Sequence, residues 1–185
     1  MKEYNITTDK LKSLCPTLCA GDKVILSGTV YTARDAAHKR IFEALENGLP
    51  LPFNIKNAVI YYAGPTPTPD GLAIGSCGPT TSSRMDSFTP RLLDMELCAT
   101  IGKGERSKEA VDAIVRNKSV YLCAIGGAGA LLARCIRKSE LIAWEDLQSE
   151  ALRRLWVEKM PLVVVIDSQG NDLYEQGRAA YLASR

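Results

Sequence analysis

The stretch LCATIGKGERSKEAVDAIVRNKSVYLCAIG, residues 97–126, has the pattern of a strand, a helix and a second strand. Its two ends, LCATIG and SVYLCAIG, are short apolar runs typical of buried strands. The segment between them is amphipathic, because its apolar residues share one helical face; they are Ala110, Val111, Ile114 and Val115. Two strands joined by a helix predict an α/β fold.

The sequence before this stretch adds further strands to the same fold. DKVILSGTVYTA (22–33) has the pattern of a strand, or of a bent strand pair interrupted at Gly28. A helix is predicted over residues 33–48, where Gly48 supplies the stop. NAVIYYAG (57–64) has the continuous apolar character of a buried strand.

The remaining pattern predicts a single α/β domain with a mixed sheet over residues 1–185. The other predicted elements are, in chain order, a short strand over 72–78, a helix over 88–97 with Thr89 as N-cap, a short helix over 127–136, a helix within 143–160, and a strand, a turn at Gly170-Asn171 and a final strand within 161–176.

Composition excludes several classes of protein. Apolar residues make up 46% of the 185 residues and charged residues 24%, which is ordinary for a globular domain. The net charge of +2 is too small for a large nucleic-acid surface, and no run of 18 apolar residues predicts a membrane span. The N-terminus lacks the apolar core of a signal peptide, so we expect a cytoplasmic protein.

The cysteines do not have the spacing of a metal site or of a disulfide framework. None of the six forms a CxxC pair, and the single histidine, His38, does not complete a set of four zinc ligands. We expect no metal ligands in this chain. The cysteines are Cys15, Cys19, Cys77, Cys98, Cys123 and Cys135.

GPTTSSRMDS, residues 78–87, is the strongest candidate for a binding segment. Five hydroxyl side chains surround Arg84, and backbone N–H groups are exposed where the chain reverses. Such a segment can bind a carboxylate or a phosphate. Because Ser83 and Asp86 have capping-box spacing, a capped helix start with a solvated arginine is the alternative.

Two glycine-rich loops follow strands and offer similar chemistry. IGKGERS places Lys103 between two glycines, which favours either an anion site or a plain strand–helix connection. AIGGAGALL (124–132) has the start of a dinucleotide fingerprint at Gly127 and Gly129, but its third glycine is missing. Close backbone contact explains those glycines better than nucleotide binding.

YTARDAAHKR, residues 31–40, adds charged residues at a predicted helix start. Asp35 suits the positive end of the helix dipole and Arg34 does not, so Arg34 is expected to bind an anion or to pair with Asp35. His38 lies one turn further on. A lone histidine on a helix is more often structural than catalytic.

The four segments SGTVYTARDAAHKR, GPTTSSRMDS, IGKGERS and YLCAIGGAGALLA occur in one order and spacing. Over residues 20–175 this set resembles the C-terminal part of class I, iron–sulfur fumarate hydratases and the related L-tartrate dehydratase β subunits. Residues 1–20 remain as a lead-in segment. The resemblance implies a swivelling β/β/α domain and an α subunit that carries the 4Fe–4S cluster, in an αβ heterodimer or an α2β2 assembly.

The resemblance also implies roles for individual residues. Thr80 corresponds to the proposed catalytic base, Arg84 and Arg34 to carboxylate clamps, and Lys103 to the lysine of the GKG segment. Thr81 and Ser82 are expected to contact substrate as well. The supporting residues are Asp35, His38 and Asp86, of which Asp86 resembles the fumarase form more than the tartrate form, where glutamate is expected.

The implied reaction is the reversible hydration of fumarate to L-malate. L-tartrate or another hydroxy-dicarboxylate is an alternative substrate within the same class. Two readings from other classes stay open, namely a non-catalytic anion-binding module and a nucleotide-binding protein that uses the GGAG loop.

Overall fold

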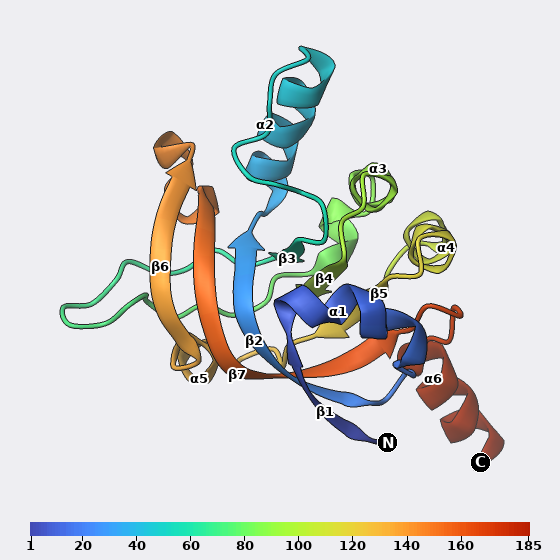
Figure 1. Ribbon diagram of the computed structural model, residues 1–185. Helices are drawn as coiled ribbons and strands as arrows, with labels where there is room; N and C mark the ends of the chain where they lie inside the picture. Colours follow the sequence, from blue (N-terminus) through green and yellow to red (C-terminus); the bar gives the residue numbers. More distant parts are fainter.

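The computed structural model describes residues 1–185, and its seven strands form one mixed sheet. The strand order is β1-β2-β3-β4-β5-β7-β6, and β2 also pairs with β7, so the sheet closes on itself as a barrel (Figure 1). The strands are β1 (Glu3–Thr7), β2 (Lys23–Thr32), β3 (Val59–Tyr61), β4 (Ala99–Gly102), β5 (Val120–Cys123), β6 (Ile136–Ala143) and β7 (Leu152–Ile166). The expected α/β fold with a mixed sheet is therefore confirmed.

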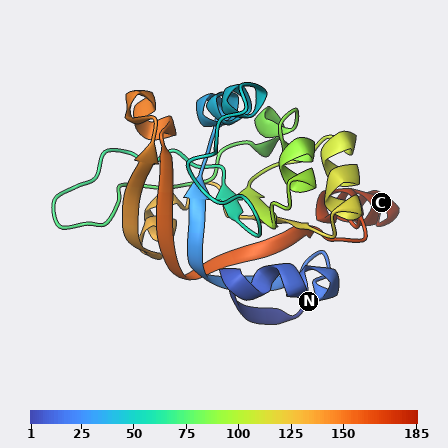
Figure 2. The same cartoon turned by 45° about the horizontal axis from the view of Figure 1, so that its top comes forward.

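The helices lie mainly on the outside of the barrel. Figure 2 shows α2, α3 and α4 side by side along one edge of the sheet. The α-helices are α1 (Thr8–Leu14), α2 (Asp35–Glu46), α3 (Thr89–Asp94), α4 (Lys108–Arg116), α5 (Gly129–Ala133) and α6 (Leu173–Ala183), and the 3-10 helices are η1 (Cys15–Thr17), η2 (Ser82–Met85) and η3 (Glu145–Glu150).

Two apolar cores hold these layers together. The first fills the barrel with side chains such as Leu26, Val30 and Leu122, and the second lies between the sheet and helices α2–α4, with Ile41 and Leu92 as members. Strand β2 alternates exposed or half-buried residues with buried ones, as a strand with one face in a core must.

Gly28 lies beside a β-bulge within one continuous strand, where the sequence left open a bent strand pair. The pairing of β2 with β7 shifts register between Leu26 and Gly28, and Gly28 has a φ of +119°. A Cβ at Gly28 would lie 2.3 Å from the Thr8 hydroxyl, so only glycine fits where α1 crosses the strand.

The N-terminal twenty residues are built into the domain. Strand β1 pairs in parallel with β2, and Ile6, Leu11 and Leu18 are buried in the barrel core. The lead-in segment of the sequence analysis is thus an edge strand and a helix. No helix of the protein is both long and apolar enough to cross a membrane.

Three predicted elements were wrong. Residues 72–78 form no strand, the second part of 143–160 is the start of β7 rather than a helix, and the chain ends in helix α6 rather than in a strand. The error in β7 has a physical cause: one extra residue opposite Gly28 puts Val157 and Met160 on the same buried side, three residues apart. That spacing imitates a helix.

Candidate functional site

The candidate residues gather at the carboxyl ends of neighbouring parallel strands. Strands β2, β3, β4 and β5 run parallel in this order, so their carboxyl ends share one edge. Arg34 follows β2, Gly64 follows β3, Lys103 follows β4 and Gly126 follows β5. This edge is where α/β folds usually bind ligands.

Residues 80–82 run across this edge between β3 and β4. The Thr80 N–H donates to the Tyr62 carbonyl at 2.7 Å, and the Ser82 N–H donates to the Lys103 carbonyl at 2.9 Å. Thr81 pairs with Lys103 as a parallel bridge. The backbone thus fixes the segment, and the hydroxyls of half-buried Thr80 and exposed Thr81 make no hydrogen bond within the chain.

Ser82 supports the loop from below. Its side chain is buried, lies 2.9 Å from the Tyr121 hydroxyl, and accepts a hydrogen bond from the Lys103 N–H at 3.1 Å. A Cβ at Gly102 would lie 1.9 Å from the Ser82 Oγ, so the glycine makes room for this contact. The Ser82 hydroxyl is therefore engaged within the loop, where it fixes the Lys103 backbone.

Arg34 is held by a carboxylate from a distant part of the chain. Its Nη2 lies 3.4 Å from Glu150 Oε1, and Glu150 Oε2 accepts the Ala36 N–H at 2.9 Å. The sequence left open an anion or Asp35 as partner, and the structure supplies Glu150 from η3 instead. A Cβ at Gly64 would lie 2.8 Å from Arg34 Nη1, so the strand end closes around the guanidinium.

Arg84 pairs with Asp35 through two contacts. Its Nε donates to Asp35 Oδ1 at 2.9 Å, and its Nη2 lies 2.7 Å from Asp35 Oδ2. The Arg84 side chain is 47% exposed, so the pair is accessible to a ligand. The structure therefore joins η2 to the start of α2, and it brings Arg34, Asp35 and Arg84 together.

His38 is a neutral residue that supports the Arg34 backbone. Its Nδ1 lies 2.8 Å from the Arg34 carbonyl oxygen, which can only accept, so Nδ1 carries the proton. Burial lowers the pKa of His38 to about 4. Its Nε2 is buried without a partner, and its ring lies edge-on to Tyr62 at 5.5 Å between centroids. His38 does not contact the open site.

The segment Ser83–Asp86, which has capping-box spacing, contacts the loop after β4. Ser83 and Asp86 form no capping box, because Thr81 is the N-cap residue of η2 and no side chain caps that end. The Asp86 Oδ1 instead accepts the Arg106 Nε at 2.6 Å, and its Oδ2 accepts the Ser107 N–H at 2.6 Å. The Arg106 side chain is fully buried. This pair ties η2 to the loop after β4, and the sequence analysis missed Arg106 although it lies inside IGKGERS.

Two threonines and two tyrosine rings complete the surroundings of Arg106. Its Nη1 donates to the Thr100 hydroxyl at 3.1 Å and its Nη2 to the Thr89 hydroxyl at 2.7 Å. Its guanidinium carbon lies 4.8 Å from the centre of the Tyr121 ring and 5.5 Å from that of Tyr62. Thr89, expected as an N-cap, is instead the first residue of α3 and donates to the Met85 carbonyl.

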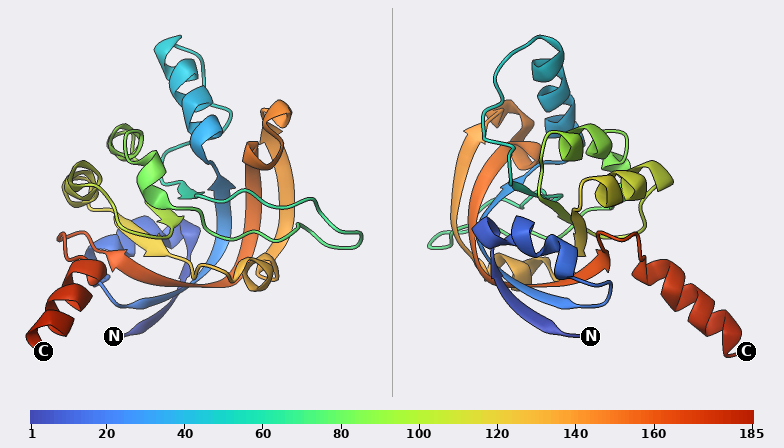
Figure 3. Two further views of the ribbon diagram at one scale, coloured as in Figure 1. Left: turned by 180° about the vertical axis from the view of Figure 1, so that it is seen from behind. Right: turned by 45° about the vertical axis from the view of Figure 1, so that its right-hand side comes forward.

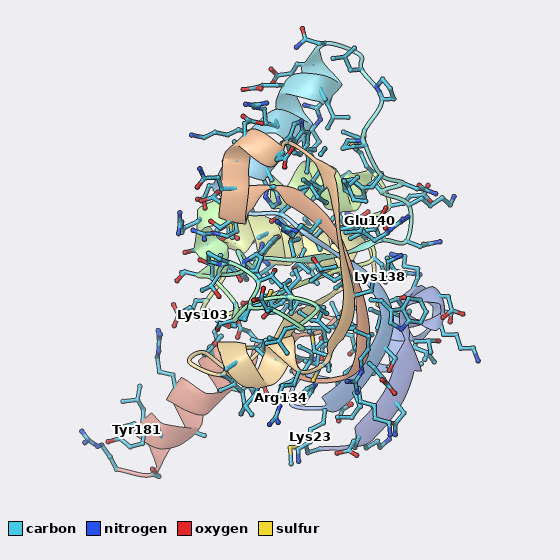
Figure 4. The ribbon with its side chains drawn as sticks, turned by 90° about the vertical axis from the view of Figure 1, so that its left-hand side faces the viewer. Lys23, Lys103, Arg134, Lys138, Glu140 and Tyr181 are labelled. Atoms are coloured by element: carbon cyan, nitrogen blue, oxygen red, sulfur yellow. The ribbon has the colours of Figure 1, made fainter.

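The GGAG loop contacts the backbone of the site. A Cβ at Gly129 would lie 3.1 Å from the Gly78 nitrogen, and the Cys77 N–H donates to the Gly129 carbonyl at 3.1 Å. Figure 4 shows Lys103 next to the turn that leads into α5. Gly129 therefore brings two backbone segments close together, as expected from the sequence, whereas a Cβ at Gly127 would contact nothing.

The chain offers no ligand set for an iron–sulfur cluster. No group of three or more His, Cys, Asp or Glu side chains is placed to hold a metal ion. The thiols of Cys15 and Cys98 are paired in the core at 3.9 Å, away from the strand ends that carry the site. The residues present do not fit a 4Fe–4S cluster.

Comparison with known proteins agrees with this arrangement. The family model described as Fumarase C-terminus matches residues 1–177. The chain belongs to the fumarase C-terminus family. Among its relatives, a fumarate hydratase 2 of Leishmania major is 41% identical over 170 residues, which cover 91% of this chain but 30% of that protein. The chain thus spans about a third or less of the curated fumarate hydratases it matches.

Other members of the fumarase C-terminus family match over most of their length. A putative L(+)-tartrate dehydratase subunit beta of Methanocaldococcus jannaschii is 38% identical over 165 residues, which cover 86% of this chain and 85% of that protein. The L(+)-tartrate dehydratase subunit beta of Escherichia coli is 29% identical over 192 residues, and the match covers 92% of that protein. In length, this chain is therefore similar to these beta subunits.

Proposed function

We propose that the chain is the β subunit of a hydro-lyase that hydrates fumarate to L-malate. The observation that supports this best is that Arg34, Lys103 and the segment 80–84 all lie at the carboxyl ends of neighbouring parallel strands. A dicarboxylate needs cations on two sides, and this edge provides them on rigid strand ends. The names of the relatives, fumarate hydratase and tartrate dehydratase subunit beta, support the reaction class.

The arginines bind and orient the substrate in this proposal. A guanidinium forms two parallel hydrogen bonds with a carboxylate, which fixes direction as well as charge. Asp35 holds Arg84 in a two-contact geometry before substrate arrives. A substrate carboxylate takes the place of Asp35 on Arg84, so little side-chain freedom is lost on binding.

In this proposal, Thr80 and Lys103 assist the removal of the substrate proton next to a carboxylate. Removing a proton next to a carboxylate builds negative charge on that carboxylate, and preorganised cations stabilise it. A neutral threonine is a weak base. The Lys103 cation and the arginines lower the cost of negative charge at the Thr80 Oγ, which either accepts the proton or orients a water that does.

The proposal includes an α subunit. The cluster and its ligands are expected on that partner, because this chain has no fitting ligand set. An αβ heterodimer or an α2β2 assembly is compatible with a β chain of this length.

Anaerobic co-expression with the α-type chain tests this function. We expect the purified complex to hydrate fumarate, and the β chain alone to show no turnover and to retain no iron or sulfide. A complex that contains the cluster but is inactive on fumarate, mesaconate and both tartrates would contradict the proposal.

L-tartrate dehydration is a second candidate, because two beta subunits of that name match over most of their length. The same preparation separates the two, since kcat/KM for L-tartrate and for fumarate are measured side by side. A higher value for L-tartrate would favour the second candidate.

A further inference from the structure

A polar cleft of about 550 Å³ opens beside Arg34. Residues 64–68 form one wall, Gln148 and Ser149 form another, and Arg153 completes the lining. No acidic and no large apolar side chain lines it. A concave surface built from glycine, proline, hydroxyl, amide and guanidinium groups suits an anion rather than an apolar ligand.

The cleft and the Arg34 site share a wall. A Cβ at Gly64 would lie 2.8 Å from Arg34 Nη1 and 2.9 Å from the Ser149 carbonyl oxygen. Gly64 and Ser149 both line the cleft. A ligand bound to Arg34 would therefore lie close to the cleft.

Arg153 points toward the mouth of the barrel. It lies opposite Thr32 of β2, and its N–H donates to the Thr32 hydroxyl at 3.1 Å. Leu155, two residues further along β7, is fully buried in the barrel core, and side chains two apart on a strand share a face. Arg153 is thus the charged end of the column of side chains that fills the barrel.

Arg153 has no carboxylate partner in the chain. Its neighbour Arg154 faces outward and lies 2.7 Å from Glu140, whereas no acidic group lies within ion-pair distance of Arg153. The Nε of Arg153 and the Nε of Arg34 are both buried without a hydrogen-bond partner. Arg153 itself lines the cleft, so an anion bound there would supply the counter-charge that the chain does not provide.

We propose that this cleft is a carboxylate subsite shared by Arg34 and Arg153, with Arg153 as a specificity-determining residue. The ligand class is a small organic acid with at least two carboxylates, one of which enters the cleft while the rest lies at the Thr80 edge. Thr66, Thr68 and Ser149 line the cleft, so we expect their hydroxyls to bind a hydroxyl substituent on that acid. The identity of the ligand as a substrate rests on the proposed function, whereas the anion site itself does not.

Kinetics of the anaerobically assembled αβ complex test the assignment. In Arg153→Gln, KM for the diacid is expected to rise at least tenfold with kcat within twofold, because binding is lost and chemistry is not. Arg153→Lys keeps the charge and is expected to stay within threefold in KM. Arg154→Gln removes the adjacent, outward arginine and serves as the matched control, with unchanged KM. An unchanged KM in Arg153→Gln, or equal loss of kcat in the glutamine and lysine variants, overturns the proposal.

Direct anion binding separates this proposal from the proposed function. Calorimetric titration of the full chain with inorganic sulfate is expected to give an affinity at least fivefold weaker in Arg153→Gln than in the wild type or Arg154→Gln. If that difference is found while the complex turns over no diacid, the subsite stands and the proposed function fails. If the complex is active and sulfate binds all three proteins equally, the subsite is wrong.

Discussion

At the scale of single residues, Arg34 and Arg84 are each held by an acidic side chain from another element. Asp35 of α2 pairs with Arg84 of η2, and Glu150 of η3 pairs with Arg34. Because the carboxylates are already in place, the arginines are oriented before any ligand arrives. The two pairs are also partly exposed, so an incoming carboxylate can compete for the same guanidinium groups.

Arg84→Lys is expected to lower kcat/KM of the assembled enzyme at least tenfold. Lysine keeps the charge but loses the planar fork, and a charged bidentate contact is worth about 1.5–3 kcal/mol. Steady-state kinetics measure this. Arg116→Lys is the matched control, because Arg116 makes the same two-contact pair with Asp94 on the surface. Wild-type kinetics in Arg84→Lys would remove Arg84 from the site.

His38 predicts a pH dependence of stability. Its pKa falls from 6.5 to about 4 on folding, so the native state stays neutral where the unfolded chain binds a proton. Its contribution is therefore fully present above pH 6.5 and is lost as pH falls toward 4. We expect about 2 kcal/mol of destabilisation from this residue between pH 7 and pH 5.

Urea unfolding at pH 7 and pH 5 measures the effect of His38. The variant His38→Gln keeps a donor for the Arg34 carbonyl and has no titrating group, so its free energy of unfolding should change less between the two pH values. Equal pH dependence in wild type and variant would show that His38 is protonated in the native state as well.

At the scale of elements, the site depends on close contacts between loops that follow neighbouring strands. The Thr80–Ser82 segment pairs with the Lys103 backbone, and the buried Asp86–Arg106 pair fastens the next turn to the same loop. The GGAG turn contacts the chain just before this segment, where the Cys77 N–H donates to the Gly129 carbonyl. The loops are thus fixed to one another and to the strand ends.

Gly102→Ala is expected to displace the Ser82 hydroxyl and lower both stability and activity. The new Cβ would lie 1.9 Å from the Ser82 Oγ, so the hydrogen bond to the Lys103 N–H is lost. We expect a loss of about 1–3 kcal/mol in the free energy of unfolding, measured with urea. Gly177→Ala is the control: nothing lies within 4 Å of that Cβ, and alanine favours the helix. A stability loss as large in Gly177→Ala would argue against this mechanism.

Arg106→Met is expected to destabilise the protein by about 3–5 kcal/mol, since it leaves the Asp86 carboxylate buried without its cation. The double variant Arg106→Met, Asp86→Leu removes both charges and should recover part of that loss. Chemical denaturation of the three proteins measures both values. If the double variant is less stable than the single one, the cost arises from lost packing rather than from the unpaired charge.

At the scale of the whole molecule, helix α6 is the element least tied to the domain. Figure 3 shows it extending away from the barrel beside α4, and none of its side chains is buried. Its contacts with the body include the Tyr174 hydroxyl, which accepts the Gly104 N–H at 3.2 Å, and an exposed ion pair of Arg178 with Glu105.

Deleting residues 177–185 is therefore expected to cost less than about 1 kcal/mol of unfolding free energy, because exposed ion pairs and exposed helices contribute little. Thermal and urea unfolding of the shortened chain check this. A loss above that value would mean that the helix contacts the barrel more strongly than the structure indicates.

The sequence predicted those features that depend on residues close to one another in the chain. Strands β2–β5 and helices α2 and α4 follow from hydrophobic periodicity, and Arg34 and Lys103 were recognisable because each follows a strand. The partner of Arg34 was not recognisable, because Glu150 reaches it from a distant part of the chain. The bulge opposite Gly28 hid the first half of β7, since it replaces the two-residue alternation with a three-residue spacing.

The antiparallel pairing of β2 with β7, which closes the barrel, also has a consequence for biosynthesis. Residues 23–32 pair with residues 153–163, so the first of these strands is made long before its partner. Until then one edge of β2 has no neighbour and its backbone groups can pair with other chains. Barrel closure is thus a late event in the synthesis of this domain, because it requires residues 153–163.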